Sequence, residues 1–165
     1  MRRAPVHRAA LLALGAGMLI AASACAPKNE QRPVSARFVD GRVEVTISYD
    51  HSSATLQATF SPPPGFHLYS KDLARHELGF PTTLTVEGGL RTTGPLESDA
   101  EAIAFHLPQG AGTAFVYPDG PVTLRLPAVP TDGLAVIRVG YAACSDAICL
   151  PPVAGHLIVL SLQRS

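Results

Sequence analysis

Hydrophobic and polar residues alternate with a period of two along several short segments of the chain. An alternation of this kind predicts β-strands that bury one face and expose the other. The clearest apolar faces are Val43, Val45, Ile47 and Tyr49 within residues 42–50, and Leu56, Ala58 and Phe60 within residues 54–60. The polar segment "HSSA" between these two runs predicts the turn of a β-hairpin.

Further strand-like segments are bounded by glycine and proline. They cover residues 80–88, 121–129, 134–142 and 155–163. Residues 134–142 are almost wholly apolar and rich in β-branched side chains, which favours a central strand. The run "SPPPG" at 61–65 ends a strand because proline cannot donate to a sheet, and "YPDG" before residue 121 is typical of a turn.

No segment shows the period of a helix, and the chain contains 14 Gly and 15 Pro. We therefore predict an all-β protein, an antiparallel β-sandwich of immunoglobulin-like architecture. The chain has no Trp, so the Cys–Trp–Cys core of antibody domains is absent.

The first residues of the chain have the pattern of a targeting segment. Basic residues at the start precede an apolar run at residues 9–22, which is shorter than the roughly 20 residues of a membrane-spanning helix. The run ends in "AASAC", which resembles a lipobox with Cys25 as the lipidated residue. Cleavage at a nearby site without lipidation is the alternative, and it would leave Cys25 as a free thiol.

This pattern sets the expected domain organisation. We expect a signal peptide of the lipoprotein type at residues 1–24, a polar tether at 25–35 and the β-sandwich at 36–165. The mature protein would then face an extracytoplasmic compartment and be held at a membrane by its lipid. The formal net charge of the chain is zero and no basic stripe is present, so no nucleic-acid partner is expected.

Two of the three cysteines, Cys144 and Cys149, lie close together in the segment "GYAACSDAICLPPVAGH". An oxidising compartment would allow them to form a disulfide, either structural or redox-active. Because a loop this short constrains the unfolded chain by only about 2 kcal/mol, a purely stabilising role is weakly supported. A metal site is the third possibility, although His156 is the only histidine nearby in the sequence.

The segment "GYAACSDAICLPP" resembles the active-site segment of the DsbD N-terminal family of thiol:disulfide interchange proteins. The family pattern is matched by Tyr141, Cys144, Asp146, Cys149, Pro151 and Pro152. The cysteine spacing is one residue shorter than is usual, and Ala142 stands where Gln is common. A second match is "PGFHLYSKDL" at residues 64–73, and "FPTTLTV" and "VYPDGPVTLRLP" follow in the family's order.

The resemblance implies an immunoglobulin-like domain with a redox-active disulfide, Cys144–Cys149, at one end. Such a domain receives electrons from a transmembrane thiol carrier or a thioredoxin-like protein. It passes them to oxidised extracytoplasmic clients, including disulfide isomerases and proteins of cytochrome c biogenesis, as one component of a protein-disulfide reductase. The cysteines themselves carry the two electrons, so no cofactor is expected. A binding or assembly lipoprotein with a structural disulfide is the alternative.

The remaining candidate site residues are Asp146, Tyr69 and His67. Asp146 would handle protons beside the cysteines or cap the loop backbone. The resemblance places Tyr69 and His67 beside the cysteine loop, where His67 would stabilise a thiolate. Packing is the alternative role for Tyr69, and a surface position for His67.

The resemblance also implies a cap over the disulfide and an order of attack. The cap falls within residues 103–117, where the aligned segment "PQGAG" has no aromatic residue. Either Phe105 or Phe115 provides the shield instead, or the shield is missing. The family's second cysteine bonds to partners, which makes Cys149 the nucleophile and Cys144 the resolving residue. Burial at the end of an apolar strand would also make Cys144 the less reactive of the two.

Overall fold

The computed structural model of the chain describes residues 34–73 and 79–162. The expected signal peptide, Cys25 and all but the last two residues of the expected tether lie outside the described residues. In the described part, no helix is long and apolar enough to cross a membrane.

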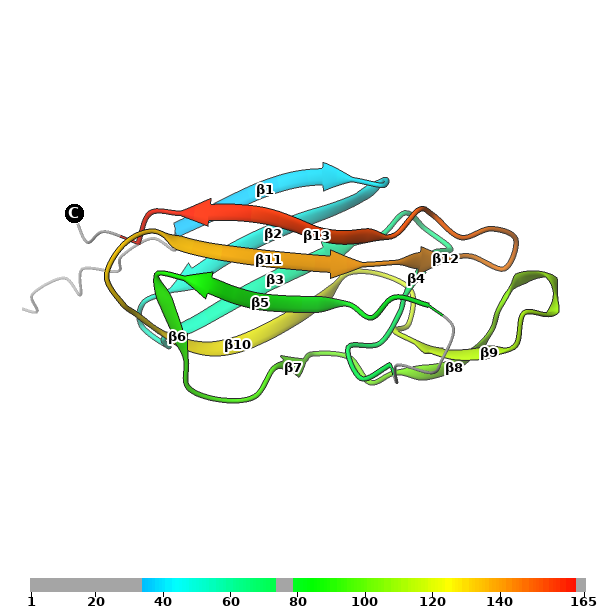
Figure 1. Cartoon of the computed structure of the whole chain (residues 1–165). Helices are drawn as coiled ribbons and strands as arrows, with labels where there is room; N and C mark the ends of the chain where they lie inside the picture. Colours follow the sequence, from blue (N-terminus) through cyan, green and yellow to red (C-terminus); the bar gives the residue numbers. More distant parts are fainter. Residues whose placement is uncertain (1–33, 74–78, 163–165) are drawn as a thin grey trace, which may run out of the picture. The chain divides into compact units, whose positions relative to one another are not determined.

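Two antiparallel sheets face each other (Figure 1). The larger sheet has the order β1-β2-β3-β10-β6, with β7 also paired to β10. Its strands are β1 (Val34–Asp40), β2 (Val43–Asp50), β3 (Thr55–Ser61), β10 (Val122–Pro130), β6 (Leu90–Thr92) and β7 (Glu97–Ser98). The smaller sheet has the order β13-β11-β5, from β13 (Val153–Leu160), β11 (Ala135–Tyr141) and β5 (Thr83–Gly88). The predicted all-β, immunoglobulin-like sandwich is confirmed.

The predicted alternation fixes which side chains are buried. In β2 and β3 every second residue is buried, and the two strands pair through the predicted hairpin with Val45 opposite Phe60. β11 is the central strand of its sheet, as its apolar sequence predicts. β1 starts at Val34, so the sheet includes two residues that the sequence assigned to the tether.

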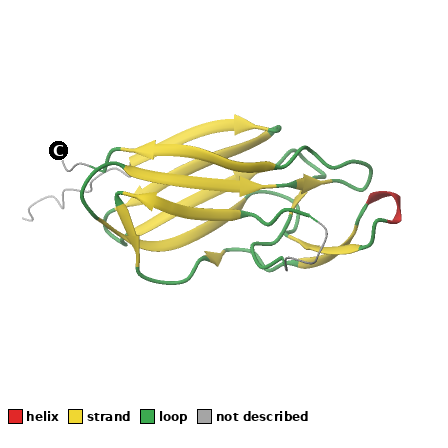
Figure 2. Cartoon of the chain, viewed as in Figure 1, coloured by secondary structure: helices red, strands yellow, loops and turns green. Residues whose placement is uncertain are grey.

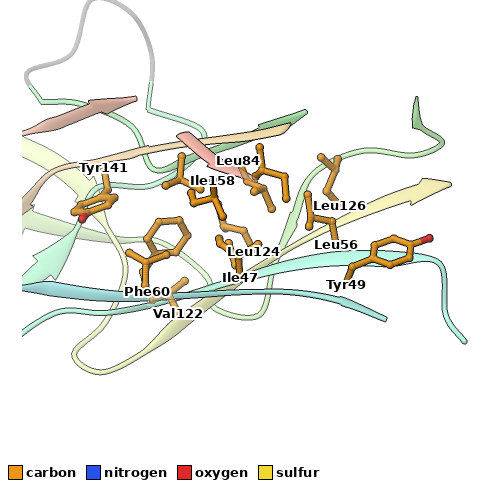
Figure 3. Close-up of a cluster of buried hydrophobic side chains, with 14 of the residues drawn as sticks. Ile47, Tyr49, Leu56, Phe60, Leu84, Val122, Leu124, Leu126, Tyr141 and Ile158 are labelled. Atoms are coloured by element: carbon orange, nitrogen blue, oxygen red, sulfur yellow. The ribbon is translucent and has the colours of Figure 1, made fainter. Parts of the chain in front are cut away.

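The core lies between the two sheets (Figure 3). Its larger members include Ile47, Tyr49, Leu56, Phe60, Leu84, Leu124, Ile137, Tyr141 and Ile158. Phe60 of one sheet meets Tyr141 of the other edge-to-face, with ring centroids 5.5 Å apart. Each buried side chain of this size stabilises the fold by about 1.5–3 kcal/mol. This core fixes the end of β11, from which the cysteine segment continues.

The glycine pair at 88–89 carries the chain from one sheet to the other. Gly89 has a φ of +70°, and a Cβ built on it would lie 2.1 Å from the carbonyl oxygen of Leu134. Only glycine therefore fits at this crossing. The sequence predicted that the strand would end here, and β6 begins at Leu90 in the opposite sheet.

Four short strands at one end of the sandwich were not predicted. β4 (His67–Leu68) pairs with β12 (Ala143–Cys144), and β8 (Ile103–His106) pairs with β9 (Thr113–Val116). A 3-10 turn, η1 (Pro108–Gly110), lies at the tip of the β8–β9 hairpin and is the short helical segment in Figure 2. Two-residue strands are too short to show a period, and β8 is mostly exposed on both faces. β9 alternates between exposed and buried residues, but over only four positions.

Candidate functional site

The cysteine segment continues directly from the central strand β11. Past Tyr141 the chain leaves its partner β13 and pairs with β4 instead, so that Cys144 lies opposite His67. The hydroxyl of Tyr141 donates a hydrogen bond to the carbonyl oxygen of Asp40 at 2.9 Å and anchors this point to β1. Burial, together with the negative charge of Asp40, raises the pKa of Tyr141 to about 12.

Cys144 and Cys149 face each other across a tight backbone turn. The amide of Leu150 donates to the carbonyl of Ala143, and the amide of Ser145 donates to the carbonyl of Ile148, both at 2.8 Å. The cysteines lie between these two bonds as a non-hydrogen-bonded antiparallel pair, in which Cα atoms come closest. Their Cα atoms are 4.0 Å apart and their sulfurs form a disulfide. The backbone itself therefore holds the two sulfurs together.

The two cysteines differ in exposure to solvent. Cys144 is 1% exposed, whereas Cys149 belongs to an exposed stretch at residues 146–149. Cys149 is therefore the cysteine of the pair that lies at the surface. The difference arises because Cys144 is the last residue of the buried strand β12, whereas Cys149 lies in the exposed loop that follows it.

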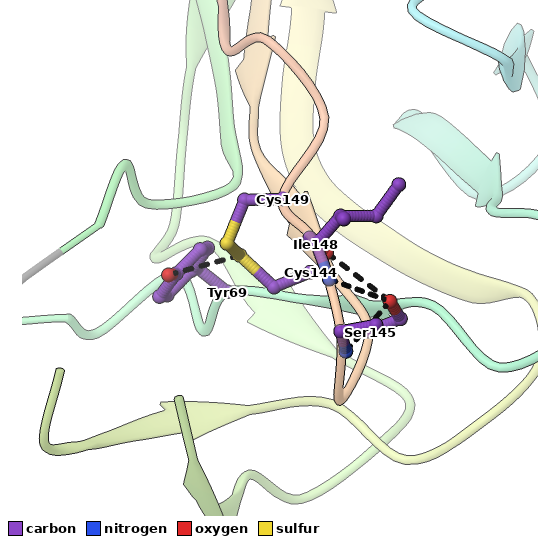
Figure 4. The surroundings of a disulfide bond; sticks show 6 residues. Tyr69, Cys144, Ser145, Ile148 and Cys149 are labelled. Atoms are coloured by element: carbon purple, nitrogen blue, oxygen red, sulfur yellow. Dashed lines mark hydrogen bonds between the residues drawn. A yellow bond between two sulfur atoms is a disulfide. The ribbon is translucent and has the colours of Figure 1, made fainter. Parts of the chain in front are cut away.

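Tyr69 lies beside the disulfide, and its hydroxyl is directed at Cys144 (Figure 4). The hydroxyl is 3.2 Å from Sγ of Cys144. A disulfide sulfur carries no hydrogen, so the tyrosine O–H is the donor. Tyr69 is 4% exposed, and burial raises its pKa further above the neutral range, where a phenol is already protonated. Tyr69 is thus both a packing residue and a hydrogen-bond donor to sulfur.

His67 lies across from Cys144 in the β4–β12 pair, but its ring nitrogen contacts other groups. Nδ1 is 3.2 Å from the carbonyl oxygen of Tyr117 and 3.8 Å from Oδ1 of Asp119. The ring also packs against Phe105, with centroids 4.7 Å apart. His67 is therefore a half-buried neighbour of the site, with its polar contacts directed toward the turn before β10.

The loop between the cysteines is capped by Ser145. Its hydroxyl lies 3.3 Å from the amide of Ala147 and 3.2 Å from the amide of Ile148 (Figure 4). Asp146 is exposed beside it, and among residues 34–73 and 79–162 it forms no side-chain hydrogen bond. Ser145, and not Asp146, therefore caps the loop backbone. A serine two residues before a loop amide commonly caps that amide, so Ser145 was a candidate that the sequence already offered.

The cap region expected at residues 103–117 is the β8–β9 hairpin. Its two aromatic residues differ in orientation. Phe105 is half-buried and packs against the cluster that contains Cys144, whereas Phe115 is 49% exposed. The buried members of this cluster are Tyr69, Leu73, Leu107, Ala114, Val116, Ala142 and Cys144. Of the two candidates, Phe105 is therefore the aromatic residue on the disulfide side of the hairpin.

Pro151 and Pro152 follow the cysteine loop and are exposed. With Asp40 and Gly41 they line an open groove beside it. Among the described residues, no group of three or more His, Cys, Asp or Glu side chains is placed to hold a metal ion. The arrangement combines a disulfide between an exposed and a buried cysteine with a hydroxyl donor to the buried one, which suits thiol–disulfide exchange.

The family model for "Thiol:disulfide interchange protein DsbD, N-terminal" matches residues 35–160. The chain belongs to this family. The resemblance drawn from the cysteine segment and from "PGFHLYSKDL" is thereby confirmed, and the chain is a DsbD N-terminal-type thiol:disulfide interchange domain.

Among solved structures, the DsbD N-terminal-type fold is similar to that of the N-terminal periplasmic domain of ScsB from Proteus mirabilis. The TM-score is 0.51 and the sequence identity is 16%, over 74% of this chain and 47% of that chain. The chain thus spans about half of the ScsB domain, and the likeness concerns the fold. No curated protein matches the chain in sequence.

Proposed function

We propose that the domain passes reducing equivalents from a thiol donor to oxidised client proteins, with Cys149 as the exchanging sulfur and Cys144 as the resolving sulfur. One observation carries this proposal. The two residues of a single disulfide differ in exposure, with Cys144 at 1% and Cys149 at the surface. A structural bridge has no need of such a difference, whereas an exchange reaction requires one sulfur that a partner reaches and one that it does not.

Reduction of a client takes two displacements. The Cys149 thiolate attacks one sulfur of the client disulfide, forming a mixed disulfide and releasing a client thiolate. The Cys144 thiolate then attacks Sγ of Cys149, re-forming the Cys144–Cys149 bond and releasing the second client sulfur as a thiolate. The client gains two electrons and, from solvent, two protons, and the domain is oxidised by two electrons.

A donor dithiol restores the reduced domain. Its thiolate attacks Sγ of Cys149, the bond to Cys144 breaks and Cys144 leaves as a thiolate. The Tyr69 hydroxyl, 3.2 Å from Sγ of Cys144, stabilises this leaving group by donating a hydrogen bond. Exchange is faster when the leaving thiolate is more stable, so Tyr69 accelerates this step. The donor's second thiol then resolves the mixed disulfide.

His67 and Asp146 complete the proposed site. Asp146 is an exposed carboxylate in the cysteine loop and relays protons to and from Cys149. His67, one strand across from Cys144, stabilises a thiolate there. Alkylation of the reduced cysteines over pH 5–9 tests both roles, because Asp146→Asn or His67→Gln should change the pH profile. Profiles identical to that of the unaltered protein would remove these residues from the site.

We further propose an extracytoplasmic location, with a lipid on Cys25 that tethers the sandwich to a membrane through residues 25–33. The supporting pattern is the apolar run that ends in "AASAC". The intact mass of protein purified from membranes should show cleavage before Cys25 and a diacylglyceryl adduct. A mature chain without any lipid mass would contradict the anchor and leave the exchange function untouched.

The proposed electron donor is a transmembrane thiol carrier or a thioredoxin-like protein, and the proposed clients are oxidised extracytoplasmic proteins, including those of cytochrome c biogenesis. Membership of the DsbD N-terminal family supports this choice. The oxidised domain should be reduced by a thioredoxin-like protein far faster than by glutathione at the same thiol concentration. Equal rates would contradict a dedicated protein donor.

The reduction potential separates exchange from a merely structural bridge. Structural disulfides have potentials below about −300 mV, and catalytic ones lie above that value. Equilibration with glutathione or dithiothreitol buffers, read by alkylation and mass, should place the Cys144–Cys149 couple above this boundary. A potential well below it would support the alternative of a binding lipoprotein with a structural disulfide.

A further inference from the structure

The ring of Tyr69 is covered by the backbone of Gly79. Gly79 has a φ of +125°, and a Cβ built on it would lie 2.3 Å, 2.5 Å and 2.7 Å from Cε1, Cδ1 and Cζ of Tyr69. No real Cβ approaches another heavy atom so closely, so any other residue at 79 would displace the ring or the loop. The absence of a side chain at Gly79 is what leaves room for the Tyr69 ring in its observed position.

The peptide group of Tyr69 is held from both sides. Its amide donates to the carbonyl of Ala142 at 3.2 Å, next to the cysteine strand. Its carbonyl accepts two hydrogen bonds from Thr82, one from the amide at 3.3 Å and one from the hydroxyl at 2.6 Å. Thr82 is fully buried, so water does not compete for this second bond. Two bonds from one threonine to a single carbonyl fix the Tyr69 peptide more firmly than one ladder bond does.

We propose that Gly79 and Thr82 are positioning residues for the exchange reaction. Together they hold the Tyr69 hydroxyl on Sγ of Cys144, so that the O–H is already aligned when an attack on Cys149 sends the bonding electron pair to Cys144. The inference rests on the proposed function. It adds that the segment at 79–82, far in sequence from the cysteines, sets the rate at which the disulfide opens.

The substitution Gly79→Ala tests the contact with the ring. The measurement is the second-order rate of reduction of the oxidised full chain by dithiothreitol at pH 7. We expect Gly79→Ala to slow reduction by about threefold to tenfold, the range for loss of one hydrogen bond, and Tyr69→Phe to do the same. Gly133→Ala is the matched control, because Gly133 also has a positive φ, +95°, with no atom within 4 Å of its Cβ position. It should reduce at the unaltered rate.

A double variant shows whether Gly79 acts through the hydroxyl. In the Tyr69→Phe background, Gly79→Ala should slow reduction no further, because the donor is already gone. Thr82→Val, which removes one bond to the Tyr69 carbonyl, should slow reduction, and Thr82→Ser should restore it. If Gly79→Ala prevents folding, the comparison of Thr82→Val with Thr82→Ser still tests the inference.

Three results would overturn the inference. Additive effects of Gly79→Ala and Tyr69→Phe would mean that Gly79 acts independently of the hydroxyl. An unchanged reduction rate in Tyr69→Phe would mean that the Tyr69 hydroxyl does not assist the departure of Cys144, so its positioning would not matter. Equal reduction rates for Thr82→Val and Thr82→Ser would mean that the hydrogen bond from the Thr82 hydroxyl to the Tyr69 carbonyl does not position Tyr69. A failure of the proposed function would look different from a failure of this inference. In that case the unaltered protein itself would resist reduction by a thioredoxin-like protein.

Discussion

Cys144 and Cys149 lie directly opposite each other, with Cα atoms 4.0 Å apart, between two backbone hydrogen bonds of the same turn. These bonds, from Leu150 to Ala143 and from Ser145 to Ile148, do not involve the sulfurs. The backbone hydrogen bonds of the turn therefore do not depend on the S–S bond for a donor or an acceptor. We therefore expect little reorganisation of the chain when the disulfide is reduced.

The first prediction is that reduction of the disulfide destabilises the domain only modestly. Because the closed loop is so short, the free energy of unfolding should fall by about 2 kcal/mol or less. Urea unfolding of the oxidised protein and of the protein kept in dithiothreitol would give the difference. Unfolding on reduction alone would instead identify the bridge as a structural one.

The second prediction concerns the two aromatic residues of the β8–β9 hairpin. Phe105 is packed against the cluster that contains Cys144, whereas Phe115 is 49% exposed. Phe105→Ala should speed alkylation of the reduced cysteines and cost about 2 kcal/mol of stability, roughly half the value for a fully buried Phe. Phe115→Ala is the matched control and should change both quantities little. If the two variants react at the same rate as the unaltered protein, Phe105 is no shield.

The third prediction is a loss of stability at high pH that depends on Tyr141. Its pKa is raised to about 12 in the folded protein, from about 10 in an unfolded chain. Below pH 10 the hydroxyl is neutral in both states and its stabilising effect is complete. Between pH 10 and 12 only the unfolded state ionises, so the free energy of unfolding falls as pH rises.

The variant Tyr141→Phe isolates this effect. It should be less stable at pH 7 by about 1 kcal/mol, because the hydrogen bond to the carbonyl of Asp40 is lost. Its stability should also decline less steeply above pH 10. Tyr69, whose pKa is also raised by burial, supplies part of the remaining decline. Denaturant unfolding at pH 7, 10 and 11.5 measures both the difference at pH 7 and the decline above pH 10. If stability declines equally in the two proteins above pH 10, the raised pKa of Tyr141 is not the cause.

Long, strictly alternating segments could be predicted from the sequence because their burial repeats every second residue. The β2–β3 hairpin and the central position of β11 follow from this rule, and the structure has both. The cysteine pair and its family could also be predicted, since spacing and flanking prolines are local features. Family membership, shown by the match to residues 35–160, confirms that part.

The surroundings of the pair could not be predicted, because they depend on contacts between distant segments. Gly79 and Thr82 act on Tyr69 through its ring and its peptide group, and no local pattern marks such a contact. Ser145 and Asp146 are adjacent loop residues of similar turn preference, and only the fold decides which one caps the loop. The polar contacts of His67 with Tyr117 and Asp119 arise likewise from a turn about 50 positions away.

Trapping with single cysteine variants is the most direct test of the central claim, that Cys149 exchanges with partners and Cys144 resolves. Cys144→Ser should accumulate a mixed disulfide through Cys149 with a thioredoxin-like donor, because no second sulfur remains to release it. Cys149→Ser should trap little, because Cys144 is only 1% exposed. Trapping through Cys144, or by neither variant, would contradict the account.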